Sequence, residues 1–138
     1  ALIMASIIEK EASINADRRL VAAVLLNRLK RGMRLQSDPT VLYEATASPL
    51  SPIPITKTQL KTKTPWNTYV IKGLPKTPIC NPGEESLMAA LNPADSDYLY
   101  FVSDGKGGLR FAKTLDVHNR NVRLFRKFEA AAKKDKAQ

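Results

Sequence analysis

The stretch that decides the fold opens the chain and reads Ala1-Leu2-Ile3-Met4-Ala5-Ser6-Ile7-Ile8-Glu9-Lys10-Glu11. Its apolar residues recur at helical spacing, so residues 1–12 are predicted to form a helix. On a helical wheel of about 100° per residue, one side collects the large apolar side chains Ile3, Met4, Ile7 and Ile8. Glu11 falls within about 10° of the centre of that side, whereas Glu9 falls nearly opposite. The two glutamates are therefore expected to have different environments.

Glu11 is the candidate catalytic acid, because a carboxylate on an apolar face is costly when it is ionised. Its pKa should rise, and a carboxyl that keeps its proton near neutral pH can serve as a general acid. Glu9 has the position of an ordinary surface acid. The residues alone leave one alternative open, in which Glu11 ends its helix in water or pairs with Arg18 or Arg19.

The next segments read as further helices separated by loops. A second helix is predicted to begin at Asn15 or Asp17, either of which suits an N-cap, and to stop near Gly32. Three prolines within residues 48–55 predict a loop. Thr56 is predicted to cap a short helical turn.

The C-terminal half supplies the predicted β-structure. Residues 98–102 are aromatic and β-branched, which predicts a strand, and the glycine-rich turn at 104–108 predicts a hairpin with 109–112. Helices are predicted on either side, over residues 84–92 and from Thr114 onward. Strands do not alternate with helices, so the predicted class is α+β: a helix-rich single domain with a small antiparallel sheet.

Composition bounds the kind of chemistry. At 138 residues and 43% hydrophobic content, the chain suits one domain with its own core. Cys80 and His118 are the only cysteine and histidine, which excludes an intrachain disulfide and a multi-histidine or thiolate metal site. We therefore expect no metal and no cofactor. No apolar run reaches the roughly 18 residues of a membrane span. Because the chain starts without Met inside a helix-like stretch, an anchor segment is expected to lie outside it.

The formal charge of +9 favours anionic partners such as nucleic acid, acidic lipid or a bacterial wall polymer. A lysine-rich solvated surface explains the charge equally well. A nucleic-acid-binding domain should show a clustered basic face with stacking aromatics, and the sequence shows neither. Nucleic acid is therefore not an expected partner.

Several blocks follow one another in a recognisable order over most of residues 2–122. They read Ala5-Ser6-Ile7-Ile8-Glu9-Lys10-Glu11, Val24-Leu25-Leu26-Asn27-Arg28-Leu29, Gly32-Met33-Arg34-Leu35-Gln36-Ser37-Asp38-Pro39-Thr40-Val41, Thr64-Pro65-Trp66-Asn67-Thr68-Tyr69, Asn81-Pro82-Gly83 and Tyr98-Leu99-Tyr100-Phe101-Val102. Together these blocks resemble the MltG (YceG-like) family of endolytic murein transglycosylases.

The resemblance implies that residues 1–138 are a catalytic domain with a groove for a glycan strand, and that Glu11 is its catalytic residue. The implied reaction cleaves the MurNAc-GlcNAc β-1,4 bond of nascent peptidoglycan strands, leaves 1,6-anhydro-MurNAc ends and helps to terminate glycan elongation. Glu11 alone would perform both proton transfers. The resemblance also implies a single-pass protein of the bacterial inner membrane with its catalytic domain in the periplasm. A membrane anchor and a LysM-like subdomain would precede this chain, and peptidoglycan synthases are expected partners.

The family blocks also contain the expected substrate-binding residues, which are Gln36, Asp38, Asn67 and Tyr69. Each has a structural alternative: Asp38 before Pro39 suits a helix cap, Tyr69 suits the core, and Asn67 suits a turn. His118 is expected to cap or pack the last helix.

The chain departs from the family pattern in two places. Leu109-Arg110 stands where the family often has a histidine, and residues 44–63 are rich in proline. The competing interpretation of the whole chain is a catalytically inert peptidoglycan-binding module.

Overall fold

The computed structural model describes residues 1–45 and 55–137. Its elements in chain order are α1 (Leu2–Glu11), α2 (Asn15–Lys30), α3 (Asp38–Ala45), α4 (Lys57–Lys61), α5 (Glu84–Leu91), β1 (Tyr100–Ser103), β2 (Leu109–Ala112) and α6 (Leu115–Ala137). The prediction of a helix-rich α+β fold with one antiparallel hairpin is confirmed. The loop predicted at 48–55 lies almost wholly outside the described residues.

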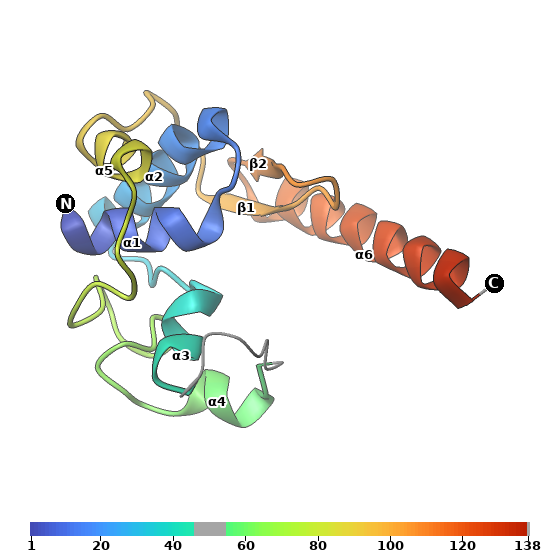
Figure 1. Cartoon of the computed structure of the whole chain (residues 1–138), viewed down its shortest axis with the longest axis horizontal. Coiled ribbons are helices and arrows are strands. Elements are labelled where there is room, and N and C mark those ends of the chain that lie inside the picture. Colours follow the sequence, from blue (N-terminus) through green and yellow to red (C-terminus); the bar gives the residue numbers. More distant parts are fainter. Residues whose placement is uncertain (46–54, 138) are drawn as a thin grey trace.

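Helix α1 forms the centre of the core and packs against α2 and α5 (Figure 1). Its predicted apolar face is buried, and Ile7 and Ile8 have no exposed surface. Val21 and Leu25 from α2 are 0% and 1% exposed in the same core. Burial of each such side chain contributes about 2 kcal/mol, so this helix pair anchors the domain. Glu11 is the last residue of α1, and the core therefore fixes its position.

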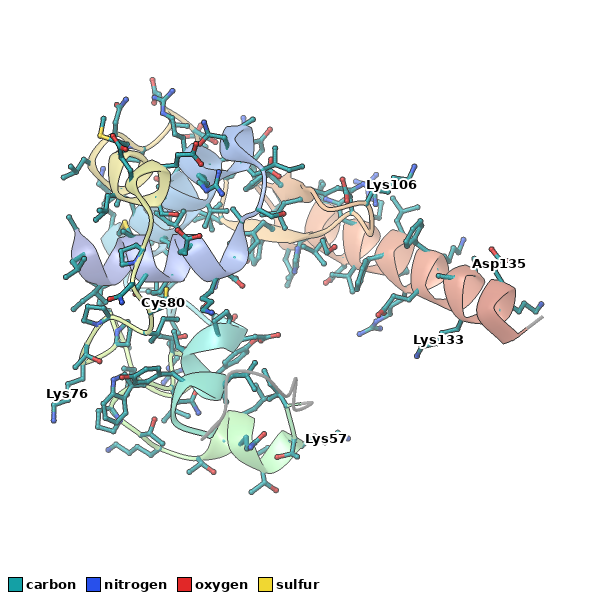
Figure 2. All side chains as sticks on the ribbon, in the orientation of Figure 1. Lys57, Lys76, Cys80, Lys106, Lys133 and Asp135 are labelled. Atoms are coloured by element: carbon teal, nitrogen blue, oxygen red, sulfur yellow. The ribbon has the colours of Figure 1, made fainter. Side chains whose placement is uncertain are left out.

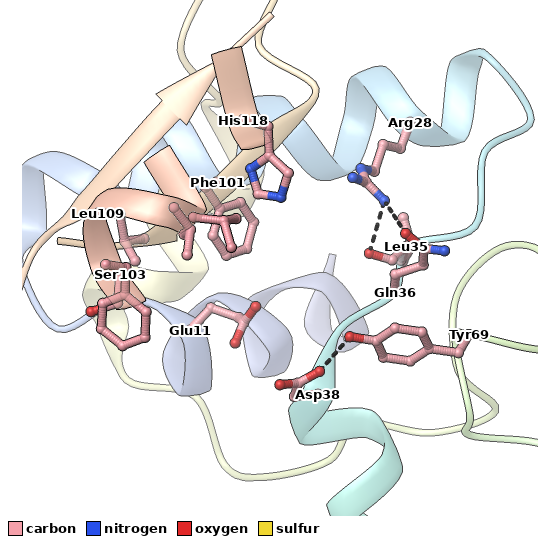
Figure 3. A pocket seen from close by; sticks show the side chains of 13 residues that line it. Glu11, Arg28, Leu35, Gln36, Asp38, Tyr69, Phe101, Ser103, Leu109 and His118 are labelled. Carbon is pink, nitrogen blue, oxygen red and sulfur yellow. Dashed lines mark hydrogen bonds between the residues drawn. The ribbon is translucent and has the colours of Figure 1, made fainter. Parts of the chain in front are cut away.

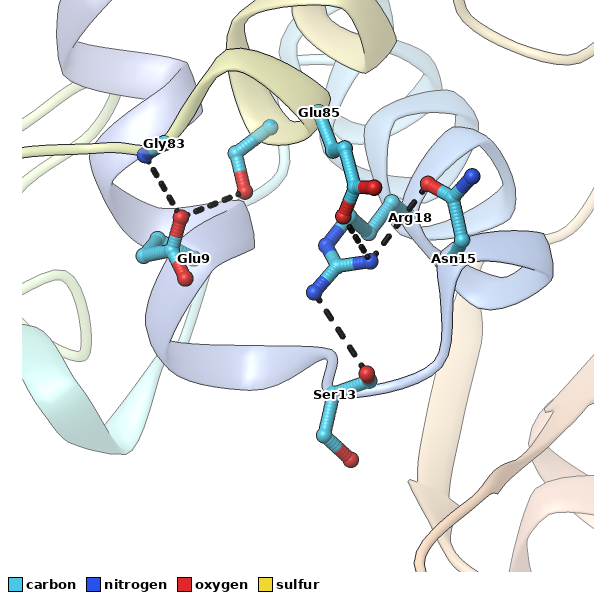
Figure 4. A network of polar contacts seen from close by, with 7 residues as sticks. Glu9, Ser13, Asn15, Arg18, Gly83 and Glu85 are labelled. Atoms are coloured by element: carbon cyan, nitrogen blue, oxygen red, sulfur yellow. Dashed lines mark hydrogen bonds and ion pairs between the residues drawn. The ribbon is translucent and has the colours of Figure 1, made fainter.

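Glu9 has a role beyond the predicted one. Its Oε1 accepts hydrogen bonds from the Gly83 backbone N–H at 2.7 Å and from Ser86 Oγ at 3.0 Å, at the N-terminus of α5 (Figure 4). These bonds hold the pKa of Glu9 below its ordinary value, and the bond from Gly83 has the largest effect. Glu9 thus lies on the outer side of α1, and beyond the prediction it accepts these two bonds, because the chain around Gly83 returns to that side. An unpaired helix N-terminus favours a negative charge at this point.

The two arginines that were candidates to neutralise Glu11 are engaged elsewhere. Arg18 pairs with Glu85 at 3.1 Å and also contacts Asn15 (Figure 4). The Nε of Arg19 donates to the backbone carbonyl of Asn92 at 2.8 Å. These interactions tie α2 to α5 and to the residue that ends α5.

The start of α2 also differs from the prediction. The N-cap is Ile14, which makes no side-chain capping bond, and Asn15 is already the first helical residue. Asp17 does not cap the helix, because its Oδ2 accepts a hydrogen bond from the Leu109 backbone N–H at 3.1 Å. A tertiary contact with the hairpin has replaced the local cap. The helix cap predicted at Thr56 is confirmed, and it takes the form of a capping box with Gln59.

The hairpin pairs β1 and β2 in antiparallel register, with Tyr100 opposite Ala112 and Ser103 opposite Leu109. Strand β1 begins two residues later than the sequence predicts, and the backbone carbonyl of Tyr98 accepts a hydrogen bond from Asn27 Nδ2 at 2.9 Å. Helix α6 packs on the hairpin and then projects beyond the rest of the domain (Figure 1).

The surface shows where the positive charge lies. Lys57, Lys76, Lys106 and Lys133 occupy distant parts of the molecule (Figure 2). This spread fits a solvated basic surface better than one nucleic-acid-binding face. Within residues 1–45 and 55–137, no helix is both long and apolar enough to cross a bilayer.

Candidate active site

Several elements of the fold together form one open pocket of about 440 Å³ (Figure 3). Its walls come from the end of α1, from α2, from the segment before α3, from the loop before α5, from the hairpin and from α6. The lining residues are Glu11, Arg28, Leu35, Gln36, Asp38, Tyr69, Phe101, Val102, Ser103, Leu109, His118, Val122 and Phe125.

Glu11 lies on the floor of this pocket, between apolar and polar walls (Figure 3). Burial, with a smaller contribution from the nearby carboxylate of Asp38, raises the pKa of its carboxyl group from 4.5 to about 7. Among the described residues, its carboxyl group receives no hydrogen bond that would offset the burial. A proton is therefore retained on Glu11 near neutral pH, as a general acid requires.

Asp38 and Tyr69, both predicted from the sequence to bind substrate, meet in the same wall. The Tyr69 hydroxyl donates a hydrogen bond to Asp38 Oδ1 (Figure 3). Burial raises the pKa of Tyr69 above its ordinary value, and the bond to Asp38 adds to the effect. The pocket thus contains the carboxylate of Asp38 beside that of Glu11.

A buried hydroxyl network holds Asp38 and Tyr69 together. The Ser37 backbone N–H donates to Thr68 Oγ1 at 2.9 Å, and the hydroxyls of Thr40 and Thr68 are 2.8 Å apart. Ser37 directly precedes Asp38 and Thr68 directly precedes Tyr69, and Thr40 and Thr68 are both 0% exposed. The network therefore fixes one side of the pocket, since such bonds are strongest away from water.

Gln36 reaches the pocket through an unusual backbone conformation. Its φ of 52° lies in the left-handed region that residues other than glycine rarely adopt. A bond from its backbone N–H to the Thr68 carbonyl at 3.2 Å supports this conformation, and its side-chain Oε1 lies 3.4 Å from an Arg28 nitrogen. Strain of this kind is common where a side chain must be aimed at a ligand.

Asn67 does not line the pocket. It is 2% exposed, and its Nδ2 donates to the carbonyls of Gln59 and Thr62 at 3.0 and 2.8 Å. Its Oδ1 accepts from the Tyr69 backbone N–H at 2.9 Å. The structure thus places Asn67 behind the loop that carries Tyr69, where its amide binds backbone carbonyls at the C-terminal end of α4.

Among the pocket residues that sequence reasoning missed are two with titratable side chains, Arg28 and His118. Arg28 is 7% exposed and its Nε donates to the Leu99 carbonyl at 2.7 Å. His118 stacks on Tyr100 with ring centroids 5.0 Å apart, and burial followed by Arg28 lowers its pKa, so it is neutral near pH 7. The sequence did hold a signal for Arg28, because an arginine in the middle of an otherwise buried helical stretch needs partners for its charge.

No group of three or more potential metal ligands occurs among the residues that the structure describes. Glu11 and Asp38 are the two carboxylates of the pocket, and the chemistry that they offer directly is proton transfer and electrostatic stabilisation.

Comparison with known proteins places this geometry in a family. A sequence model described as the YceG-like family matches residues 1–124. The chain belongs to the YceG-like family. An endolytic murein transglycosylase of Bacillus subtilis is 46% identical over 119 residues, which are 86% of this chain and 32% of that protein. One from Streptococcus pneumoniae is 35% identical over 124 residues, which are 88% of this chain and 22% of that protein.

A crystal structure of a YceG-like protein from Listeria monocytogenes has the same fold. It superposes with a TM-score of 0.76 at 47% identity and covers 86% of this chain and 37% of that one. The chain thus spans about a third or less of the length of these relatives. The pocket described above lies almost wholly within the part matched to the YceG-like family.

We expect Asp38→Asn to shift the pH dependence of activity in this YceG-like pocket. The substitution removes a negative charge that raises the pKa of Glu11, whereas the asparagine oxygen can still accept the Tyr69 bond. Glu11 then loses its proton at lower pH, so the alkaline limb of the pH–rate profile should move to lower pH. The move should be partial, because burial is the larger cause.

Cleavage rates measured between pH 5 and 9 test this prediction. The groups that face Glu11 across the pocket are Asp38, Tyr69, Arg28 and His118. Asp116→Asn is the matched control, since this exposed aspartate of α6 does not line the pocket. An alkaline limb that stays in place in Asp38→Asn would show that Asp38 does not influence Glu11.

Proposed function

We propose that this chain is the catalytic part of an endolytic murein transglycosylase, with Glu11 as the acid and base. The observation that carries the proposal is a carboxyl group with a pKa of about 7 at the floor of an open pocket. The relatives that match the chain carry that name. Gln36, Asp38 and Tyr69 are proposed to contact the sugars, and Asn67 to act by holding the loop that carries Tyr69.

In the first step, the protonated Glu11 donates its proton to the glycosidic oxygen between N-acetylmuramic acid and N-acetylglucosamine. The C1–O bond breaks, the leaving sugar departs with that proton, and positive charge develops at C1 of the muramoyl residue. The carboxylate of Glu11 and that of Asp38 both lie in the pocket where they stabilise this charge. Tyr69 donates a hydrogen bond to Asp38 and so orients the second carboxylate.

In the second step, the C6 hydroxyl of the same muramoyl residue attacks C1. Its proton passes to Glu11, and a 1,6-anhydro ring closes. Glu11 is then protonated again, so one group completes the cycle without metal or cofactor. A hydrolase normally needs a second carboxylate to activate water. Here the substrate supplies the nucleophile.

The whole protein extends beyond this chain in our proposal. The enzyme acts on the wall outside the cytoplasm, and a single membrane anchor and a LysM-like subdomain lie in segments outside residues 1–138. Its glycan substrate is the nascent strand, whose elongation it helps to terminate beside peptidoglycan synthases.

The products of cleavage test the proposed function. Purified glycan strands incubated with the chain in ¹⁸O-labelled water should yield 1,6-anhydro-muramoyl ends without label, read by mass spectrometry. Reducing ends that carry ¹⁸O would instead indicate hydrolysis with Asp38 as the second carboxylate. Binding without new ends would indicate an inert peptidoglycan-binding module.

A further inference from the structure

A second pocket adjoins the first along α6. It has a volume of about 370 Å³ and lies between the hairpin turn and the part of α6 that projects from the domain. Its lining residues are Ser103, Gly105, Gly107, Phe125, Phe128, Glu129, Ala132 and Lys133. Ser103 and Phe125 line both pockets, so the two form one continuous groove that leads away from Glu11.

An aromatic ring forms one wall of this second pocket and is held in place. Phe128 is 39% exposed, yet its ring packs closely against Gly105. Gly105 has a φ of 81°, and a Cβ atom at this position would overlap the Phe128 ring. Glycine therefore permits both the turn and the close approach of the ring. The result is a fixed aromatic surface that remains open to the groove.

The charge of the lining selects the kind of ligand. Glu129 and Lys133 contribute one charge of each sign, so the pocket has no excess of positive charge for a polyanion. The face of a pyranose ring that carries C–H bonds is apolar and packs well on an aromatic ring, while its hydroxyls bond to polar groups at the rim. An uncharged sugar chain thus fits this lining better than a nucleic acid does.

We propose that the second pocket binds further sugar residues of the same glycan strand, away from the bond that is cut, with Phe128 as the stacking surface. From His118 to Lys133 the helix rises roughly 22 Å, which accommodates more than one sugar residue. Such a subsite favours long strands over short ones and directs cleavage to their interior. This inference rests on the proposed function of the first pocket.

The test compares Phe128→Ala with Leu124→Ala, both in the non-cleaving Glu11→Gln background. Leu124 is the matched control, because it is 49% exposed on the same helix and lines neither pocket. Affinity is measured for a short oligosaccharide that fills only the first pocket and for much longer peptide-free strands. We expect Phe128→Ala to weaken binding of long strands about fivefold, with short ones unchanged. Leu124→Ala should change neither.

Ala132→Glu is the second variant, because Ala132 is a half-buried residue of α6 that lines the second pocket, and glutamate is a good helix former. It fills the groove and adds a hydrated charge, so it should reproduce the selective loss. Equal losses on short and long strands in both variants would overturn the subsite. A dimer seen by light scattering and abolished by Phe128→Ala would also overturn it, as would a single-stranded DNA probe that binds more tightly than glycan.

The two proposals fail in different ways. If the proposed function fails, the unmodified chain makes no anhydro ends from any strand. If the subsite alone fails, anhydro ends form but Phe128→Ala leaves the dependence of binding on strand length unchanged.

Discussion

Glu11→Gln is expected to lower the rate of glycan cleavage by about 10³-fold or more, because in the proposed mechanism the same group serves in both proton transfers. Glutamine keeps the size and polarity of the side chain but has no proton of suitable pKa to donate. Binding of glycan strands should persist, since the pocket walls come mainly from other residues. Single-turnover cleavage and equilibrium binding, measured on the same strands, separate the two effects.

Glu9→Gln is the matched control, because it is the same substitution two positions earlier on the opposite side of α1. Removal of the Glu9 carboxylate charge weakens the bonds at the start of α5. We therefore expect slightly lower stability and nearly full activity. Retention of more than a tenth of the activity in Glu11→Gln would contradict the assignment, as would equal losses in both variants.

Removal of Glu11 should also change stability in a pH-dependent way. Its pKa is about 7 in the folded chain and near 4.5 when unfolded, so the folded state binds more protons between these values. The contribution of Glu11 to the free energy of unfolding is fully present below pH 4.5 and is lost as the pH rises through 7. Glu11→Gln avoids this loss. It should therefore be more stable than the unmodified chain at pH 8, by urea unfolding, and no more stable at pH 4.

Arg28→Met is expected to lower the free energy of unfolding by about 3 kcal/mol. The guanidinium group joins α2 to the segment before α3 and to the start of the hairpin. It does so through bonds to the carbonyls of Arg34 at 2.9 Å and Leu99 at 2.7 Å. Methionine fills much of the volume but leaves these buried carbonyls without donors, and each such loss is costly.

Arg31→Met is the control for Arg28, because Arg31 is exposed at the end of the same helix. A change within about 0.5 kcal/mol is expected for it. Arg28→Lys should recover only part of the stability, since an ammonium group cannot span both carbonyls as a planar guanidinium does. If urea unfolding gave Arg28→Met the same stability as Arg31→Met, the bracing role of Arg28 would be disproved.

Local patterns were sufficient for most helices and for the hairpin, because apolar periodicity and turn residues act over a few positions. Local patterns failed where a distant chain segment binds a side chain whose neighbours in sequence suggest another role. Asp17 looks like a helix cap but accepts from Leu109 of the hairpin. Glu9 looks solvated but caps α5, which lies more than seventy residues away in sequence. Neither partner is visible from the local sequence.

The site was predictable to the same extent. Glu11 was singled out by its helical face alone, and Asp38 and Tyr69 by the family blocks, and all three line one pocket. The contact between Asp38 and Tyr69 was not predictable, because it depends on the buried hydroxyls of Thr40 and Thr68. Arg28 and His118 were missed because α6 and α2 approach each other only across the hairpin.

Direct titration of the Glu11 carboxyl group is the sharpest test of its role as the acid. NMR of the chain labelled with ¹³C at glutamate side-chain carboxyls resolves each group, and the spectrum of Glu11→Gln assigns the missing signal. We predict a midpoint of about 7 for Glu11 and one below the ordinary value for Glu9. A Glu11 midpoint near 4.5, the ordinary value, would contradict the proposal that this residue retains a proton for catalysis.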